Sequence, residues 1–458
     1  MLNRGCRLAT GGQGDVFEVI GLGGVVLKRI FNKTLADDPE VYDRLVAMIT
    51  NPPTGWRESR SGHVMLAWPT DVVLEDERFV GFLMPAIDVA QAVELHQIAN
   101  PSDRRSPSQS IQWTKGFTWR YLVGTAENLA LATNILHSSG VVIGDFNERN
   151  VLVWSDARVT LLDCDSMQVT DHQTGRRFLC RVGRPEFTAP ELLGADWNTT
   201  VRAPSSDLFA LAIHLHQLLL EGNHPFDGVW SGAGDKPRRH VLAREGLWVH
   251  RGDPRLAPRP GVIGIEILPE AMTNLFRRAF VDGAMNPRAR PTAEEWHAEL
   301  AILRTALVPC LREPSHIYAA GRNCPWCDHI RRKPAQTPLP RATPPALPTT
   351  PPRGPQRAPA APVLPPRLST PVLPPVMPPS SPTIGPKPPV GSTHRTWEIV
   401  KRIPGSIFIS WLVSIPTSGV LYILAKNVGL NERGLVVIDA IAYAITLLVV
   451  LYKRISAI

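Results

Sequence analysis

The stretch Val141–Ser166, with the sequence VVIGDFNERNVLVWSDARVTLLDCDS, decides the fold of this chain. It contains two short apolar runs, Val151–Trp154 and Val159–Leu162, and runs of this length are typical of buried β-strands. Asp156 stands in the polar segment between them, where a turn residue is expected. The stretch therefore predicts a β-hairpin.

Polar side chains flank this hairpin on both sides. Asp145 and Asn150 precede the first apolar run, and Asp163 follows the second. Because a hairpin brings its two ends together, we expect Asn150 and Asp163 to face one small volume, with Asp145 beside them. A carboxylate and an amide oxygen suit Mg²⁺, and a further carboxylate can orient a hydroxyl nucleophile. Taken alone, these residues also fit a solvated hairpin with ordinary turn acids.

Further motifs decide between these two interpretations. Asp145–Asn150 resembles the catalytic loop of protein kinases, and Asp163 falls at the aspartate of their metal-binding DFG motif. Downstream, Gly183–Glu191 (GRPEFTAPE) resembles the end of a kinase activation segment. Upstream, Gly11–Val16 (GGQGDV) and then Val25–Lys28 (VVLK) resemble the glycine-rich loop and the strand lysine. The chain is thus similar to the eukaryotic-like protein kinases of bacteria, as a divergent member with Asp-Cys-Asp in place of Asp-Phe-Gly.

The resemblance implies an α+β, bilobal protein-kinase-like fold, with a β-rich N-lobe over residues 1–90 and a helical C-lobe over residues 91–309. It implies ATP and Mg²⁺ (or Mn²⁺) as cofactors, since kinases move a phosphoryl group whose charge the metal neutralises. The residues that it assigns to ATP binding are Gly11, Gly12, Gly14, Val16, Lys28 and Met84. Those that it assigns to catalysis are Asp145, Lys28 and Asn150, and the Mg²⁺ ligands are Asn150 and Asp163.

The resemblance also implies two structural contacts in the C-lobe. Asp207, which opens an apolar helix predicted at 208–220, would anchor the backbone of the catalytic loop, although the same residue is a good helix N-cap. Glu191 of the Ala-Pro-Glu motif would pair with Arg290.

A helix is predicted at 39–49, with Asp37 or Asp38 as its N-cap. Glu40 in this helix is a candidate for the glutamate that pairs with Lys28 in kinases. Its place in the first turn also fits a simple interaction with the helix dipole, so both interpretations stay open.

Several positions depart from the kinase pattern. Ile143 and Gly144 replace the histidine and arginine that precede the catalytic aspartate, and Asn147 replaces a lysine. Without that arginine, switching by a phosphorylated activation loop is disfavoured. Arg184 stands where a threonine marks many serine/threonine kinases, which leaves the acceptor residue open. Asp165 replaces the DFG glycine and would either join the metal site or cap a turn.

A cluster of metal-ligand residues follows the last predicted helix of the C-lobe. Its pattern over residues 310–330 is Cys310-x5-His316-x7-Cys324-x2-Cys327. Three thiolates and one imidazole match a closed tetrahedral zinc site, so we expect structural zinc. A dithiol redox pair and unremarkable free thiols are the alternatives.

Residues 331–395 are rich in proline, with alanine, serine and threonine between. Such a segment cannot bury a core, and we expect a disordered linker whose Ser and Thr are candidates for autophosphorylation. Residues 331–402 hold eleven Lys/Arg and one acid, so the formal charge of +8 leaves the rest of the chain near −2. A nucleic-acid partner is therefore not expected.

Two apolar segments near the end suit the thickness of a bilayer. Residues 406–425 carry no charge, and residues 434–452 carry a single acid. They predict a transmembrane helical hairpin over residues 404–454, with the lipid bilayer as partner. Basic residues flank its outer ends, which favours a cell-membrane location with the kinase domain and both termini in the cytosol.

Together these patterns indicate a membrane-anchored protein kinase that transfers the γ-phosphate of ATP to Ser/Thr hydroxyls of an unknown protein substrate in cytosolic signalling. The replaced motif residues favour an alternative, a pseudokinase that acts as a nucleotide-binding scaffold at the membrane. A third hypothesis is a transport or stress-response component whose work is done by the membrane hairpin.

Overall fold

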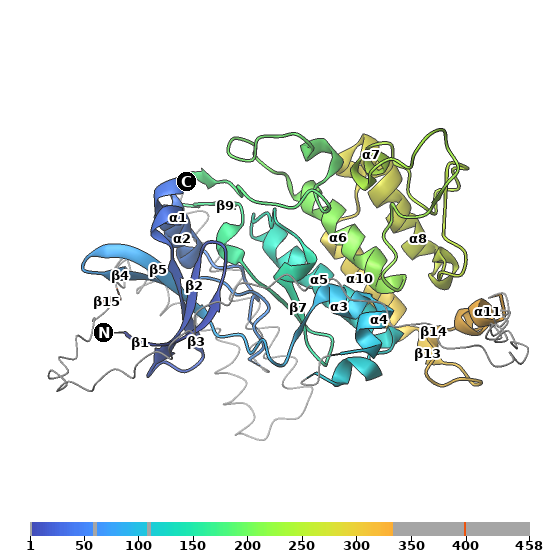
Figure 1. Cartoon of the computed structure of the whole chain (residues 1–458), viewed down its shortest axis with the longest axis horizontal. Helices are drawn as coiled ribbons and strands as arrows, with labels where there is room; N and C mark the ends of the chain where they lie inside the picture. Colours follow the sequence, from blue (N-terminus) through green and yellow to red (C-terminus); the bar gives the residue numbers. More distant parts are fainter. Residues whose placement is uncertain (1, 58–61, 108–110, 333–397, 400–458) are drawn as a thin grey trace, which may run out of the picture. The chain divides into compact units, whose positions relative to one another are not determined.

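The computed structural model describes residues 2–57, 62–107, 111–332 and 398–399 (Figure 1). The fold reported below belongs to the first of two units, Met1–Glu398. Residues 331 and 332, predicted as the start of the Pro-rich linker, are helical, and the rest of that linker and both predicted membrane spans lie outside the described residues. Within the part that the structure describes, no helix has both the length and the apolar character of a membrane span.

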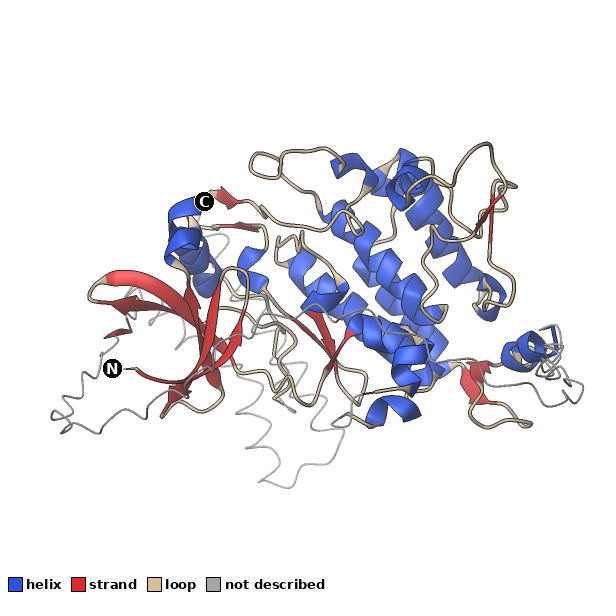
Figure 2. Cartoon of the chain, viewed as in Figure 1, coloured by secondary structure: helices blue, strands red, loops and turns tan. Residues whose placement is uncertain are grey.

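The N-terminal part is built on an antiparallel β-sheet (Figure 2). Its main strands are β1 (Asn3–Thr10), β2 (Gly14–Ile20), β3 (Val25–Ile30), β4 (Asp71–Glu75) and β5 (Arg78–Pro85). They follow the order β1-β2-β3-β5-β4, and the two-residue strand β15 (Glu398–Ile399) lies at the boundary between the two units. The stretch Val25–Lys28, which was matched to the strand that carries the kinase lysine, lies in β3 at the centre of this sheet. This part of the prediction is confirmed.

Two helices follow β3, α1 (Asn32–Asp37) and α2 (Val41–Thr50). Helix α2 buries Val41, Leu45 and Met48, which share one face at helical spacing. It begins two residues later than the predicted 39–49 segment, because Glu40 is its N-cap residue and neither Asp37 nor Asp38 caps it. Helix α2 packs against both β4 and β9 (Figure 1), so it touches the sheet and the segment after the predicted hairpin.

The rest of the described fold is mainly helical. Its helices are α3 (Leu95–Ala99), α4 (Pro101–Arg105), α5 (Trp119–Ser138), α6 (Pro204–Leu219), α7 (Arg239–Arg244), α8 (Glu270–Arg277), α9 (Gly283–Met285) and α10 (Ala293–Thr305). Helix α6 is buried along nearly its whole length, as expected of a helix that is apolar on every side. Helix α5 packs between α6 and α10, so these three form the centre of the helical core.

The predicted hairpin is confirmed as β7 (Val151–Val153) and β8 (Val159–Leu161), with β6 (Val93–Glu94) as a third strand. Three two-stranded ribbons lie further along the chain: β9 (Val169–Thr170) with β10 (Arg177–Phe178), β11 (Val229–Trp230) with β12 (Leu256–Ala257), and β13 (Leu307–Pro309) with β14 (Ile317–Ala319). Helix α11 (Pro325–Arg332) follows β14. The β-rich first part and helical second part are consistent with a kinase-like fold.

Candidate active site

The β7–β8 hairpin brings its polar flanks together. The backbone N–H of Leu162 donates to the carbonyl oxygen of Asn150 at 2.8 Å, so Asn150 lies beside Asp163. The Nδ2 of Asn150 donates to the backbone oxygen of Asp145 at 3.1 Å and to its Oδ2 at 3.4 Å. Asp163 adopts a left-handed conformation, with φ of 50° and a side chain that is 59% exposed. The three residues that were predicted to share one volume therefore do so.

Asp207 fixes the loop that carries Asp145. Its carboxylate, 2% exposed at the N-terminal turn of α6, accepts hydrogen bonds from the backbone N–H groups of Ile143 (2.7 Å) and Gly144 (2.9 Å). His137 Nε2 lies 3.0 Å from the same carboxylate. Because one buried carboxylate holds two backbone N–H groups, the loop has little conformational freedom. Asp207 thus makes the contact with the loop backbone that the resemblance implies.

The side chain of Asn147 is turned back towards Asp145. Asn147 is 1% exposed, and its Nδ2 donates to Asp145 Oδ1 at 3.0 Å. The kinase lysine that it replaces would bring a positive charge to this place. Here a neutral amide orients the Asp145 carboxylate instead.

The glycine-rich turn lies between β1 and β2. The N–H of Gly11 donates to the carbonyl oxygen of Gly14 at 2.9 Å and closes the turn. A Cβ atom on Gly14 would lie 2.3 Å from the carbonyl oxygen of Arg29, so only glycine allows β2 to approach β3 this closely. Val16 pairs with Lys28, and Val26 of β3 pairs with Met84 of β5. The residues assigned to ATP binding thus lie on three adjacent strands and their turn.

Lys28 is buried between two carboxylates. Its Nζ lies 2.9 Å from both carboxylate oxygens of Asp165 and 3.3 Å from Asp163 Oδ1. Burial by itself lowers the pKa of Lys28, but the charge of Asp165, and then that of Asp163, more than offset it and hold the pKa above its usual value. The lysine is therefore a cation locked to the residues after β8.

The predicted pair between Glu40 and Lys28 is not formed. Glu40 instead bonds Arg176, at 2.8 Å, and Arg181, both in the segment after Asp165. The residue of α2 that does reach the Lys28 neighbourhood is Arg44, whose Nε donates to the backbone oxygen of Asp165 at 2.9 Å. Sequence reasoning missed Arg44, although a charged residue amid the apolar stripe of α2 was a signal for a buried partner.

The end of the activation segment is fixed by an ion pair. Both terminal nitrogens of Arg290 bond Glu191, at 2.6 and 2.7 Å, and they also donate to the carbonyl oxygens of Ser205 and Gly283. The Arg290 residue is 2% exposed. The structure therefore brings together the two residues that were paired from the resemblance.

Gly144 explains why the kinase arginine is absent. Its φ is +75°, and a Cβ atom there would lie 2.5 Å from Cys180 Sγ and 2.8 Å from Arg202 Nη1. Arg202 is buried, and its Nη2 donates to the carbonyl oxygen of Val182 at 2.7 Å. The space beside the catalytic loop is thus filled by a cysteine and an arginine from the following segment.

The Cys/His residues converge at the end of the helical part. Ligand atoms of Cys310, His316, Cys324 and Cys327 all lie within 4.8 Å of one another. The two Sγ atoms of Cys310 and Cys327 are 3.7 Å apart, and His316 Nδ1 is 3.5 Å from Cys327 Sγ. A tetrahedral ion with Zn–S bonds of about 2.3 Å separates its sulfurs by about 3.8 Å. The donor set and its spacing fit such an ion.

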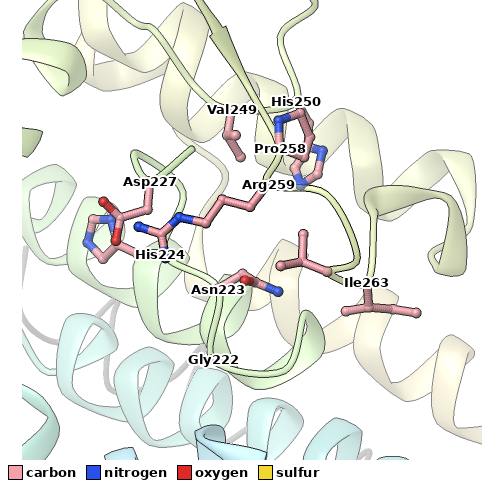
Figure 3. A pocket seen from close by; sticks show the side chains of 10 residues that line it. Gly222, Asn223, His224, Asp227, Val249, His250, Pro258, Arg259 and Ile263 are labelled. Carbon is pink, nitrogen blue, oxygen red and sulfur yellow. The ribbon is translucent and has the colours of Figure 1, made fainter. Parts of the chain in front are cut away.

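A small pocket elsewhere in the helical part holds several polar residues (Figure 3). The side chain of Arg259 extends across it, with its guanidinium towards Asp227 and His224. Burial lowers the pKa of His224 to about 3 and that of His250 to about 4, so both are neutral at pH 7. The cavity volume is about 70 Å³, far below the several hundred Å³ typical of ligand pockets. This pocket is too small for a nucleotide.

The fold and the site resemble those of protein kinases, and comparisons with known proteins point to the same class. No family model matches the chain. The chain is 28% identical over 340 residues to the protein kinase YegI of Escherichia coli K12, and equally to that of strain O157:H7. The match covers 70% of this chain and 48% of YegI, so the chain spans about half the length of these relatives.

Two shorter similarities point the same way. The chain is 30% identical over 98 residues to the PAS domain-containing serine/threonine-protein kinase of Mus musculus, covering 21% of the chain and 7% of that protein. It is 32% identical over 117 residues to the atypical protein kinase C of Drosophila melanogaster, covering 25% and 18%. All four of these similar proteins are named as protein kinases.

Proposed function

We propose that this chain is an ATP-dependent protein kinase that phosphorylates Ser or Thr hydroxyls of a protein. The observation that carries the proposal is the convergence of Asp145, Asn150 and Asp163 at the base of one hairpin, with Lys28 held against Asp163. These are the four side chains with the hardest tasks in phosphoryl transfer.

Each of these residues has a task that its surroundings support. Asp145, oriented by Asn147 and Asn150, accepts the proton of the acceptor hydroxyl as that oxygen bonds to the γ-phosphorus. The bond from the γ-phosphorus to the β–γ bridging oxygen breaks, and ADP leaves. Lys28 holds the α- and β-phosphates. The exposed Asp163 carboxylate and the Asn150 amide oxygen suit Mg²⁺, which supplies charge neutralisation when bound.

Two further assignments complete the proposal. Structural zinc would bind Cys310, His316, Cys324 and Cys327, supported by their donor set and spacing. Anchoring in a cell membrane by residues 404–454, with the kinase facing the cytosol, is supported by the two apolar segments of the sequence.

The test is transfer of labelled phosphate from ATP by the full-length chain with Mg²⁺, beside the Asp163→Asn variant. We expect label on the chain itself or on an added protein acceptor with the wild type only, and site mapping then gives the acceptor residue. Equal label with the variant would contradict the assigned metal ligand, and no label from a folded, zinc-bound wild type would contradict the kinase.

Two observations favour a second candidate, a nucleotide-binding pseudokinase. Lys28 is already neutralised by two carboxylates, and the catalytic-loop arginine and lysine are replaced by Gly144 and Asn147. Such a protein would bind ATP and show no transfer in the same experiment.

A further inference from the structure

Asp165 stands where protein kinases have the glycine of their DFG motif, and its contacts differ from those of Asp163. Both carboxylate oxygens of Asp165 lie 2.9 Å from Lys28 Nζ, and the side chain is 7% exposed. Asp163 contacts the lysine with a single oxygen at 3.3 Å and is 59% exposed. The buried carboxylate thus holds the lysine, while the exposed one remains available to a ligand.

The resemblance implies that helix α2 presents a glutamate to Lys28, but in this structure α2 presents an arginine near that site. The residue that it presents next to Lys28's partner is Arg44, which is 7% exposed and bonds the backbone oxygen of Asp165. A guanidinium cannot neutralise a lysine. The acid of this helix, Glu40, is turned to Arg176 and Arg181 instead.

We propose that Asp165 is the positioning residue for Lys28, in place of a glutamate from the helix, and that Arg44 fixes Asp165 by its backbone. The lysine is then held by a residue only two positions from the metal-binding aspartate. Its placement for the nucleotide phosphates no longer depends on an acid from α2. This inference rests on the nucleotide-binding part of the proposed function.

The same carboxylate is a poor candidate for a metal ligand. Both of its oxygens already bond Lys28 within a buried site, whereas a cation that keeps part of its water shell needs exposed oxygens such as those of Asp163. A role at the metal and a role at the lysine also predict different measurements.

The experiment compares the binding of ADP with that of adenosine, which lacks phosphates, to the full-length chain by calorimetry. For Asp165→Asn we expect the Kd of ADP to rise about tenfold, the size of one charge-assisted hydrogen bond, while the Kd of adenosine is unchanged. The matched control is Asp156→Asn, which removes the exposed carboxylate, bonded to Arg158, at the far end of the same hairpin. It should change neither value.

Three outcomes would overturn the inference. The first is an unchanged ADP affinity in Asp165→Asn, and the second is an equal loss for ADP and adenosine, which would mean a purely structural role. The third concerns Mg²⁺: if Asp165→Asn changes the Mg²⁺ concentration needed for half-maximal ADP binding but leaves ADP binding without Mg²⁺ unchanged, Asp165 is a metal ligand.

A charge exchange decides the matter if Asp165→Asn does not fold. The double variant Arg44→Glu/Asp165→Gly returns the acid to α2 and the glycine to the segment. We expect it to bind ADP more tightly than Asp165→Gly alone, and equal affinity would overturn the inference.

The two proposals fail in different ways. A chain that transfers phosphate with an ADP affinity independent of Asp165 contradicts this inference alone. A chain whose ADP affinity depends on Asp165 but that transfers no phosphate contradicts the kinase alone.

Discussion

Gly144 shows how one residue explains a departure from the kinase pattern. A left-handed φ costs a non-glycine residue about 1–2 kcal/mol, and a Cβ atom here also meets Cys180 Sγ at 2.5 Å. Overpacking a core costs about 1–3 kcal/mol more. We therefore expect Gly144→Ala to lower the free energy of unfolding by about 3 kcal/mol in urea titrations.

Gly140 provides the matched control for that variant. Its φ is +73°, and a Cβ atom there would meet nothing within 4 Å. Gly140→Ala should show the backbone strain alone, about 1–2 kcal/mol. Equal losses at both positions would mean that the contact with Cys180 has no role.

The partner of Lys28 shows where sequence reasoning stops at the residue scale. The strand that carries Lys28 and the hairpin that precedes Asp163 were both predicted, because each is a local structure. The choice between Glu40 and Asp165 depends on the rotation of α2 and on contacts across more than a hundred residues, for which the sequence alone holds no geometry.

At the scale of elements, the Glu191–Arg290 pair ties the end of the activation segment to the loop before α10. Removing one partner of a buried ion pair costs about 3–5 kcal/mol, because a charge stays behind without its counter-ion. Arg290 is buried and would be that charge. Because the Glu191 side chain is 30% exposed and Arg290 keeps its bonds to two carbonyl oxygens, we expect Glu191→Gln to lower the free energy of unfolding by less than that, by about 1–3 kcal/mol.

A surface pair is the control for this variant. Arg255 and Glu245 lie 3.4 Å apart, with both side chains about half exposed (47% and 49%). Exposed pairs contribute less than about 1 kcal/mol, so Glu245→Gln should have little effect. A loss as large as that of Glu191→Gln would contradict the role of burial.

The β13–β14 ribbon and α11 form an element around the Cys/His cluster. We expect elemental analysis to find one zinc ion per chain, and we expect Cys324→Ser to lose it. The control is Cys6→Ser, which should retain the zinc because the Cys6 thiol is exposed and is not part of the cluster. Trp326 lies between Cys324 and Cys327, and the centre of its ring is 5.8 Å from that of Trp119. Because loss of the ion should loosen this segment, it should also change the tryptophan fluorescence. Equal metal content in both variants would contradict the site.

The positions of elements were predicted more closely than their contacts. The segment predicted at 208–220 is a helix, although it starts earlier, at Pro204, since a proline suits the first turn. The β7–β8 hairpin was predictable because apolar runs and turn residues are adjacent in the sequence. The filling of the space beside Gly144 by Cys180 and Arg202 was not, because it depends on the path of the whole following segment.

At the scale of the whole molecule, buried histidines make the helical part sensitive to acid. Burial lowers the pKa of His214 to about 4, below its ordinary 6.5. Between these values the unfolded chain binds a proton that the folded chain does not. Stability is therefore complete above pH 6.5 and falls as the pH decreases towards 4, by about 3 kcal/mol for this residue.

Unfolding titrations from pH 7 to pH 4 check this expectation. His214→Asn should flatten the decline relative to the wild type, whatever its effect at pH 7. His216, His224 and His250 also have lowered pKa values, so part of the decline should remain. A decline as steep as that of the wild type would mean that His214 is protonated in the folded chain.

The exposed and the buried bonds that attach α2 to the segment after Asp163 respond differently to dissolved ions. Arg176 forms ion pairs with Glu40 and Asp43 that are exposed to solvent. Dissolved salt weakens the attraction in such pairs, because the Debye length is about 8–10 Å at physiological ionic strength and shorter at higher salt. The Arg44 bond to the Asp165 carbonyl is buried and is screened much less. Raising the salt concentration should therefore speed amide hydrogen exchange in the segment around Arg176 while the middle of α2 stays protected. The helix would then remain bonded to Asp165 through Arg44 as its first turn loosens from the segment around Arg176.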